Sequence, residues 1–108
     1  MVFVMEITVK ELKQLKDSGA DFQLIDVREP HEYDIANLGG ELIPLATVIA
    51  NHDKISHDKQ VVVHCRSGGR SGAAIKMLEQ QFGYTNLYNL KGGILAYADE
   101  VDPSLTKY

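Results

Sequence analysis

The sequence predicts an α/β domain whose mostly parallel sheet is covered by helices on both faces. Short apolar, β-branched segments such as residues 22–27 and 61–63 have the composition of buried strands. Segments with helical spacing of apolar residues separate them, and this alternation favours parallel strands joined by helices. The chain has 108 residues, enough for one core without a metal or a disulfide. We therefore expect a single domain over residues 1–108.

The N-terminal half supplies two of the expected strands and a capped helix. Residues 6–9 have strand composition, and the helix that follows begins with a capping box formed by Thr8 and Glu11. Residues 22–27 form the next strand. Pro30 then occupies the first position of a short helix, where its missing N–H costs nothing.

The C-terminal half continues the alternation. In chain order the expected elements are a helix over residues 45–55, a strand over 61–63, a helix over 71–82, a strand over 84–90 and a helix over 94–101. The tail from residue 102 to Tyr108 is expected to lie over the surface.

The only cysteine, Cys65, stands where the strand over residues 61–63 ends. The turn residues 67–69 follow it and lead into the next helix. This order places the cysteine over a helix N-terminus, where backbone N–H groups form an anion-binding nest. Arg66 and Arg70 add positive charge, and both effects favour the nucleophilic thiolate. A buried structural cysteine is the alternative, but an inert thiol needs neither two arginines nor a glycine-rich turn.

The charge distribution favours a small anionic substrate at this loop. The net charge is −4, with ten acids and five Lys or Arg in residues 1–54 but five acids and six Lys or Arg in residues 55–108. No acid lies between Asp58 and Glu79, so the field around Cys65 is positive. Nucleic acid is excluded as a partner, because it requires a broad basic face.

The remaining composition places the chain in a reducing compartment. A lone cysteine forms no intrachain disulfide, and no apolar run is long enough to span a bilayer. We expect a cytoplasmic protein with no membrane partner. No pair of histidines has metal-ligand spacing, so neither a metal nor a cofactor is expected.

The spacing from Cys65 to Arg70 separates two families that place a cysteine in this way. The tyrosine-phosphatase signature has five residues between its Cys and Arg, whereas four lie here, and the shorter loop lacks room for a phosphate group. The loop instead resembles that of the rhodanese sulfurtransferases. Residues 24–33 and 92–97 are similar to the upstream and C-terminal motifs of that family. The sequence of residues 24–45 is similar to that of rhodanese domains in enzymes that activate ubiquitin-like sulfur carriers, although Asn37 replaces the usual histidine.

This resemblance implies a single rhodanese-like domain with a five-stranded sheet and a sulfurtransferase activity. Cys65 would attack thiosulfate or another persulfide donor, carry the sulfur as a persulfide, and pass it to a thiol or a protein. Arg66 would meet the incoming sulfonate, and Arg70 would tether it. The alternative for either arginine is a salt bridge to an acid of the N-terminal half. A persulfide-carrying interaction module and a phosphatase or arsenate reductase remain as alternative functions.

The predicted site is the Cys65 loop with two supporting residues. Cys65 is the catalytic residue, and the substrate-binding residues are Arg66, Ser67, Gly68, Gly69, Arg70 and Ser71. Asp26 and Arg28 end a strand and are the supporting residues; we favour a structural role in which Asp26 fixes the loop, over one that puts Arg28 at the mouth of the site. His64 is expected to point away from Cys65, because adjacent strand residues face opposite sides.

Overall fold

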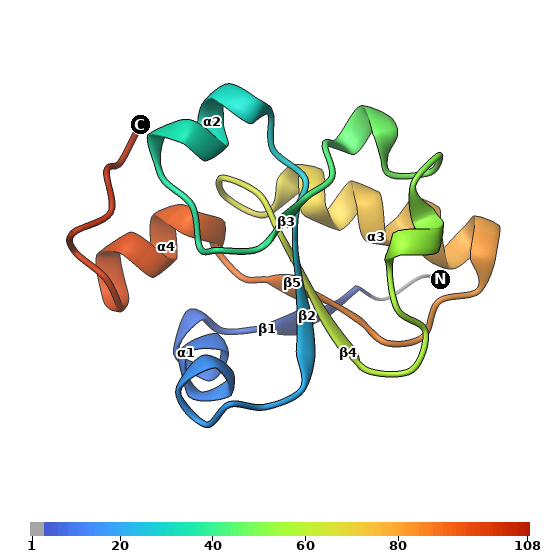
Figure 1. The fold of residues 1–108 in the computed structure, drawn as a ribbon, viewed down its shortest axis with the longest axis horizontal. Coiled ribbons are helices and arrows are strands. Elements are labelled where there is room, and N and C mark those ends of the chain that lie inside the picture. Colours follow the sequence, from blue (N-terminus) through green and yellow to red (C-terminus); the bar gives the residue numbers. More distant parts are fainter. Residues whose placement is uncertain (1–3) are drawn as a thin grey trace.

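Five parallel strands form one sheet in the computed structural model, which describes residues 4–108 (Figure 1). The strands are β1 (Met5–Ile7), β2 (Phe22–Asp26), β3 (Glu41–Leu42), β4 (Gln60–His64) and β5 (Leu87–Leu90), in the spatial order β1-β5-β4-β2-β3. The predicted α/β class and the parallel, five-stranded sheet are confirmed. Residues 1–3 of the expected domain lie outside the described residues.

Four helices cover the two faces of the sheet, as predicted. They are α1 (Val9–Asp17), α2 (Pro30–Ile35), α3 (Gly69–Phe82) and α4 (Gly93–Glu100). In β4, Val61 and Val63 pack with α3 on one face, whereas Val62 packs with α1 and α4 on the other. This alternation buries the central strand completely on both sides, as a parallel sheet requires. The capping box is present, since Glu11 N–H donates to the Thr8 hydroxyl at 3.1 Å.

The strand expected over residues 6–9 ends at Ile7, and the helix expected from residue 71 begins at Gly69. Two other expected elements differ more strongly from the structure. The helix predicted over residues 45–55 is instead two short 3-10 segments, Leu45–Thr47 and His52–Lys54. Asn51 lies between them with φ −109° and ψ 19°, which is outside the helical region. The last strand begins at Leu87 rather than at residue 84. Tyr84 precedes the strand, and its hydroxyl donates to the carbonyl oxygens of His52 and Ile55.

The carboxyl ends of β2 and β4 meet at one edge of the sheet, which is where parallel α/β sheets place their sites. Asp26 pairs in register with His64, and the N–H of Val27 donates to the His64 carbonyl at 3.0 Å. Cys65 follows directly and opens the loop into α3. The fold therefore brings Asp26 and Cys65 to the same edge.

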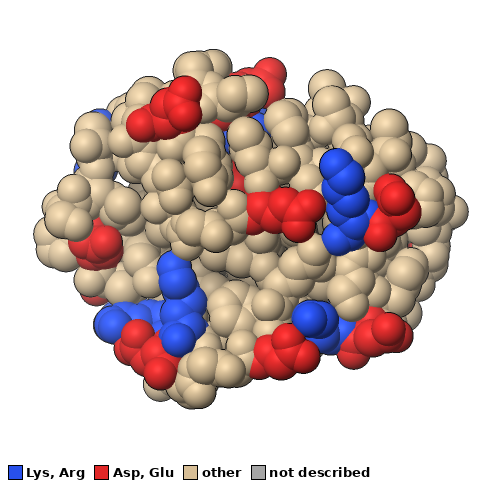
Figure 2. Space-filling model, viewed as in Figure 1, with Lys and Arg blue, Asp and Glu red and all other residues tan. Residues whose placement is uncertain are grey.

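On the face shown in Figure 2, acidic and basic side chains are interspersed, and the described residues form no broad basic area there. Within residues 4–108, no helix combines the length and the apolar composition needed to cross a membrane.

Candidate functional site: the Cys65 loop

Hydrogen bonds from the first turn of α4 fix the backbone of the Cys65 loop. Ile94 N–H donates to the Cys65 carbonyl at 3.0 Å, and Leu95 N–H donates to the Arg66 carbonyl at 3.2 Å. The approach is so close that a Cβ on Gly93 would come within 2.6 Å of the Cys65 carbonyl oxygen. Because these carbonyls are bound on the outer side of the loop, the following amides are free to face the sulfur.

Cys65 is a buried residue with 1% of its surface exposed, and two donors contact its sulfur. Gly68 N–H lies 3.1 Å from Sγ, and the Ser71 hydroxyl oxygen lies 3.3 Å from it. Gly68 has φ +114°, a conformation that glycine adopts without a steric penalty. The N-terminus of α3 begins at the next residue, so its partial positive charge lies beside the sulfur.

These contacts determine the pKa of the thiol. Burial raises the pKa of Cys65, but hydrogen bonds from the Ser71 hydroxyl and from the amides of Ser71, Gly68 and Ser67 together outweigh it, and the net pKa lies below the ordinary value. The thiolate is therefore favoured relative to an ordinary cysteine, which makes this sulfur a candidate nucleophile.

Asn89 of β5 is a site residue that the sequence analysis missed. The Ser71 hydroxyl lies 2.5 Å from Asn89 Oδ1, and Asn89 Nδ2 donates to the Gly68 carbonyl at 3.0 Å. The second contact fixes which end of the amide faces Ser71. The single Ser71 proton is thus shared between Asn89 and the Cys65 sulfur. The only hint in the sequence is a polar residue inside a buried strand.

Arg70 is paired with Glu32 of α2. The guanidinium donates to both carboxylate oxygens, at 2.6 and 2.9 Å, in a bidentate arrangement. The hydrogen bonds from Arg70 hold the pKa of Glu32 well below its usual range, and those to Glu32 raise the pKa of Arg70. The negative charge of Cys65 further raises the pKa of Arg70, so the arginine and the thiolate stabilise each other's charged state. This pair is the salt bridge to an N-terminal acid that the sequence left open.

Arg66 contacts Tyr108 instead of an acidic side chain. Its Nε donates to the Tyr108 carbonyl at 2.7 Å, its Nη2 donates to the same oxygen, and its guanidinium carbon lies 5.1 Å from the centre of the Tyr108 ring. Residues 103, 104, 106 and 107 of the tail are exposed, whereas Tyr108 is half-buried at the site. Ser67 and Gly69 are exposed at the rim of the loop.

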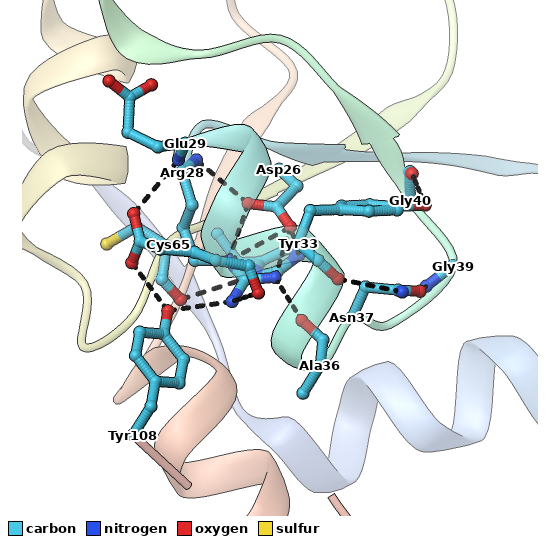
Figure 3. A network of polar contacts seen from close by, with 12 residues as sticks. Asp26, Arg28, Glu29, Tyr33, Ala36, Asn37, Gly39, Gly40, Cys65 and Tyr108 are labelled. Atoms are coloured by element: carbon cyan, nitrogen blue, oxygen red, sulfur yellow. Dashed lines mark hydrogen bonds and ion pairs between the residues drawn. The ribbon is translucent and has the colours of Figure 1, made fainter. Parts of the chain in front are cut away.

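Arg28 lies behind the site rather than at its mouth. It is fully buried and binds Asp26 through Nε and Nη2, with Nη2 at 2.7 Å from Oδ2 (Figure 3). Its remaining donors bind the carbonyls of Glu32 and Ala36 and the Tyr108 hydroxyl. All five N–H groups are therefore used. Asp26 also accepts the Arg28 backbone N–H at 3.0 Å, which fixes the turn after β2.

His64 faces away from the sulfur. Its Nδ1 lies 3.4 Å from the Cys65 carbonyl oxygen, and its Nε2 lies 3.6 Å from Asp26 Oδ2. Burial lowers its pKa, which favours the neutral ring. Among residues 4–108, no group of three or more His, Cys, Asp or Glu side chains is arranged to hold a metal ion.

Known proteins with sequences similar to this chain belong to one family. The family model described as "Rhodanese-like domain" matches residues 8–100. A sulfurtransferase of Allochromatium vinosum is 38% identical over 96 residues, covering 88% of this chain and 89% of that protein. The probable adenylyltransferase/sulfurtransferase MoeZ of Mycobacterium tuberculosis is 35% identical over 105 residues, covering 94% of this chain. The chain spans 26% of the length of MoeZ.

The solved structures agree with the sequence comparison. A rhodanese-like domain protein from Staphylococcus aureus superposes with a TM-score of 0.80 at 28% identity, covering 91% of this chain and 95% of that one. A rhodanese-related protein from Thermoplasma volcanium gives a TM-score of 0.77 at the same identity, covering 90% and 93%.

Proposed function

The chain belongs to the rhodanese-like domain family, and on that premise we propose that it is a sulfurtransferase working through a persulfide on Cys65. The observation that carries this proposal is the pair of donors on the sulfur, Gly68 N–H at 3.1 Å and the Ser71 hydroxyl at 3.3 Å. They stabilise the thiolate that must attack, and they are positioned to stabilise the charge of a persulfide afterwards.

The reaction is a double displacement. The Cys65 thiolate attacks the outer sulfur of thiosulfate or of another persulfide donor. A new S–S bond forms to Cys65 while the donor's own bond breaks, and sulfite or a thiolate leaves with the bonding electron pair. In the second half, a thiolate of a small thiol or a protein attacks the terminal sulfur and releases the Cys65 thiolate.

The surrounding residues have separate roles in this proposal. Arg66 meets the anionic part of the donor, and Arg70 stabilises negative charge on the leaving group. The amides of residues 66–71 enclose the transferred sulfur. Burial of Cys65 keeps water and bulky electrophiles away from the persulfide, and a reactive thiol that must stay reduced suits the cytoplasm.

The donor is the part of the proposal for which the structure favours a second candidate. Arg70 is already neutralised by Glu32, whereas Arg66 keeps its charge because it contacts a main-chain oxygen and the ring of Tyr108. One uncompensated arginine attracts a dianion less than two do. This favours a thiol persulfide over thiosulfate as the donor, and hence the alternative of a persulfide carrier that serves a partner protein in a sulfur relay.

Intact-mass spectrometry tests the central step. Incubation with thiosulfate, or with a glutathione persulfide donor, should add about 32 mass units, the mass of one sulfur atom, to the protein. The matched variant Cys65→Ser should gain nothing and should lack transferase activity. Loading from the persulfide but not from thiosulfate would identify the carrier role. Failure of both donors to load Cys65 would refute the proposal.

Hydrolysis of p-nitrophenyl phosphate tests the phosphatase alternative. The loop between Cys65 and Arg70 has four intervening residues, and Cys65 is buried, so we expect no turnover. Clear turnover that is lost in Cys65→Ser would overturn the argument from loop size.

A further inference from the structure

The chain's last described segment runs back from α4 to the Cys65 loop and is held along its course. Leu105 packs against the apolar cluster shared by α1 and α4. Lys107 pairs with Asp99 of α4. Tyr108 then reaches the site, although it lies 42 residues beyond Arg66 and 76 beyond Glu32 in the chain.

The direction of the hydrogen bonds of the Tyr108 hydroxyl follows from its partners. Arg28 Nη1 lies 2.8 Å from the hydroxyl oxygen, and Glu32 Oε2 lies 2.7 Å from it. A guanidinium only donates, so the hydroxyl accepts from Arg28 and its own proton goes to Glu32. The hydroxyl therefore joins a fully buried cation to the carboxylate that holds Arg70.

Through Glu32 this contact extends to Arg70. Glu32 Oε2 receives the Tyr108 hydroxyl and Arg70 Nη2, while Oε1 receives Arg70 Nη1 and the Glu29 N–H. Four donors fix the plane of the Glu32 carboxylate. Because the Glu32–Arg70 pair is bidentate, the orientation of the carboxylate also sets that of the Arg70 guanidinium.

The ring and the main-chain oxygen of Tyr108 contact Arg66. The Arg66 guanidinium lies over the tyrosine ring and donates to the tyrosine carbonyl, as described above. A single residue from the far end of the chain thus fixes both arginines that flank Cys65 in sequence. Figure 3 shows the Tyr108 hydroxyl reaching into the network beside Cys65.

We propose that Tyr108 is a positioning residue that holds Arg66 and Arg70 beside the Cys65 loop and thereby sets the affinity of the loop for an anionic sulfur donor. The inference rests on the proposed function for the identity of the donor. Without the hydroxyl, Glu32 and Arg70 gain freedom that an incoming anion must remove again. Without the ring, Arg66 also loses the aromatic surface over which its guanidinium lies.

Two alkylating reagents test this without requiring sulfur transfer. Iodoacetate is an anion and iodoacetamide is neutral, and both react with the Cys65 thiolate by the same displacement. Any change in the thiolate fraction cancels in the ratio of their rates, so the ratio reports only the attraction of the anion. We expect Tyr108→Phe to lower the iodoacetate-to-iodoacetamide ratio by about three-fold and Tyr108→Ala by about ten-fold.

Tyr84→Phe is the matched control. The Tyr84 hydroxyl also makes two hydrogen bonds, at 2.7 and 2.8 Å, but to carbonyls of residues 52 and 55 at the other end of β4. Its loss should destabilise the fold comparably and leave the ratio unchanged. Wild-type ratios in both Tyr108 variants, or an equal fall in Tyr84→Phe, would overturn the inference.

The donor reaction supplies the second readout. The KM for thiosulfate, or for an anionic persulfide, should rise by the same factors in the Tyr108 variants. If the wild-type protein takes up no sulfur at all, the proposed function fails, and the alkylation ratio alone still decides the role of Tyr108.

Discussion

Replacing Ser71 by alanine should raise the pKa of Cys65 by about one pH unit. The Ser71 hydroxyl lies 3.3 Å from the sulfur and donates to the thiolate, whereas alanine has no proton to give. A hydrogen bond to a charged group contributes about 1.5–3 kcal/mol, and a change of one in the pKa corresponds to about 1.36 kcal/mol, so the largest expected rise is about one to two pH units. Because Ser71 shares its proton with Asn89 at 2.5 Å, we expect the lower end of that range.

The rate of iodoacetamide alkylation as a function of pH measures this change. Only the thiolate reacts, so the midpoint of the profile is the pKa of Cys65. In Ser71→Ala the midpoint should move to higher pH, and a rise of about one in the pKa should slow alkylation below the midpoint about ten-fold. The rate on the alkaline plateau should stay close to that of the wild type. Ser67→Ala is the matched control, since Ser67 acts on the sulfur through its backbone amide.

An unmoved midpoint would refute the assignment of the Ser71 hydroxyl as a thiolate donor. A midpoint at lower pH would show that Ser71 binds the protonated sulfur instead. An equal change in Ser67→Ala would mean that the loop, and not the hydroxyl, controls the pKa.

Three further predictions concern the charged residues. Glu32→Gln should reduce the loss of stability in acid. The pKa of Glu32 is lowered in the folded state, so its contribution to stability is present above the unfolded pKa of about 4.3 and is lost as the pH falls through the folded value. The free energies of unfolding in urea at pH 3 and pH 7 should therefore differ less in the variant than in the wild type. Equal pH dependence in both proteins would contradict this. Arg28→Met should lower the free energy of unfolding by about 3–5 kcal/mol, because Asp26 would stay buried without its partner, and a loss near zero in chemical denaturation would show that the pair is dispensable. Arg66→Ala should raise the KM for an anionic donor by about three- to ten-fold with little change in kcat, and steady-state kinetics showing the reverse split would remove its role in binding.

The β4–loop–α3 unit was predictable because its information is local. Three adjacent β-branched residues give the strand, and the glycines at 68 and 69 give the turn. The residues around Leu45 misled the prediction for the opposite reason. Their apolar spacing fits an α-helix, and Val48 is indeed buried, but the chain must turn again at Asn51 to reach β4. Periodicity records which residues are buried and does not record where the backbone changes direction.

The polar surroundings of Cys65 were predictable only in part. Sequence spacing placed the two arginines near the sulfur, yet their partners lie 38 and 42 residues away, on α2 and at Tyr108. Asn89 reaches Ser71 across 18 residues, because β5 is the neighbour of β4 in the sheet. Such contacts follow from strand order, which local pattern does not encode. They emerge only when the sheet is assembled.

The hydrogen bonds from α4 to the Cys65 and Arg66 carbonyls make the reactivity of the Cys65 sulfur depend on the last helix of the fold. When α4 frays, the carbonyls lose their partners and the loop can turn its amides away from the sulfur. The low pKa of the Cys65 thiol thus depends on contacts outside the loop as well as on the donors inside it. The reactivity of Cys65 therefore depends on whether α4 is packed against the Cys65 loop.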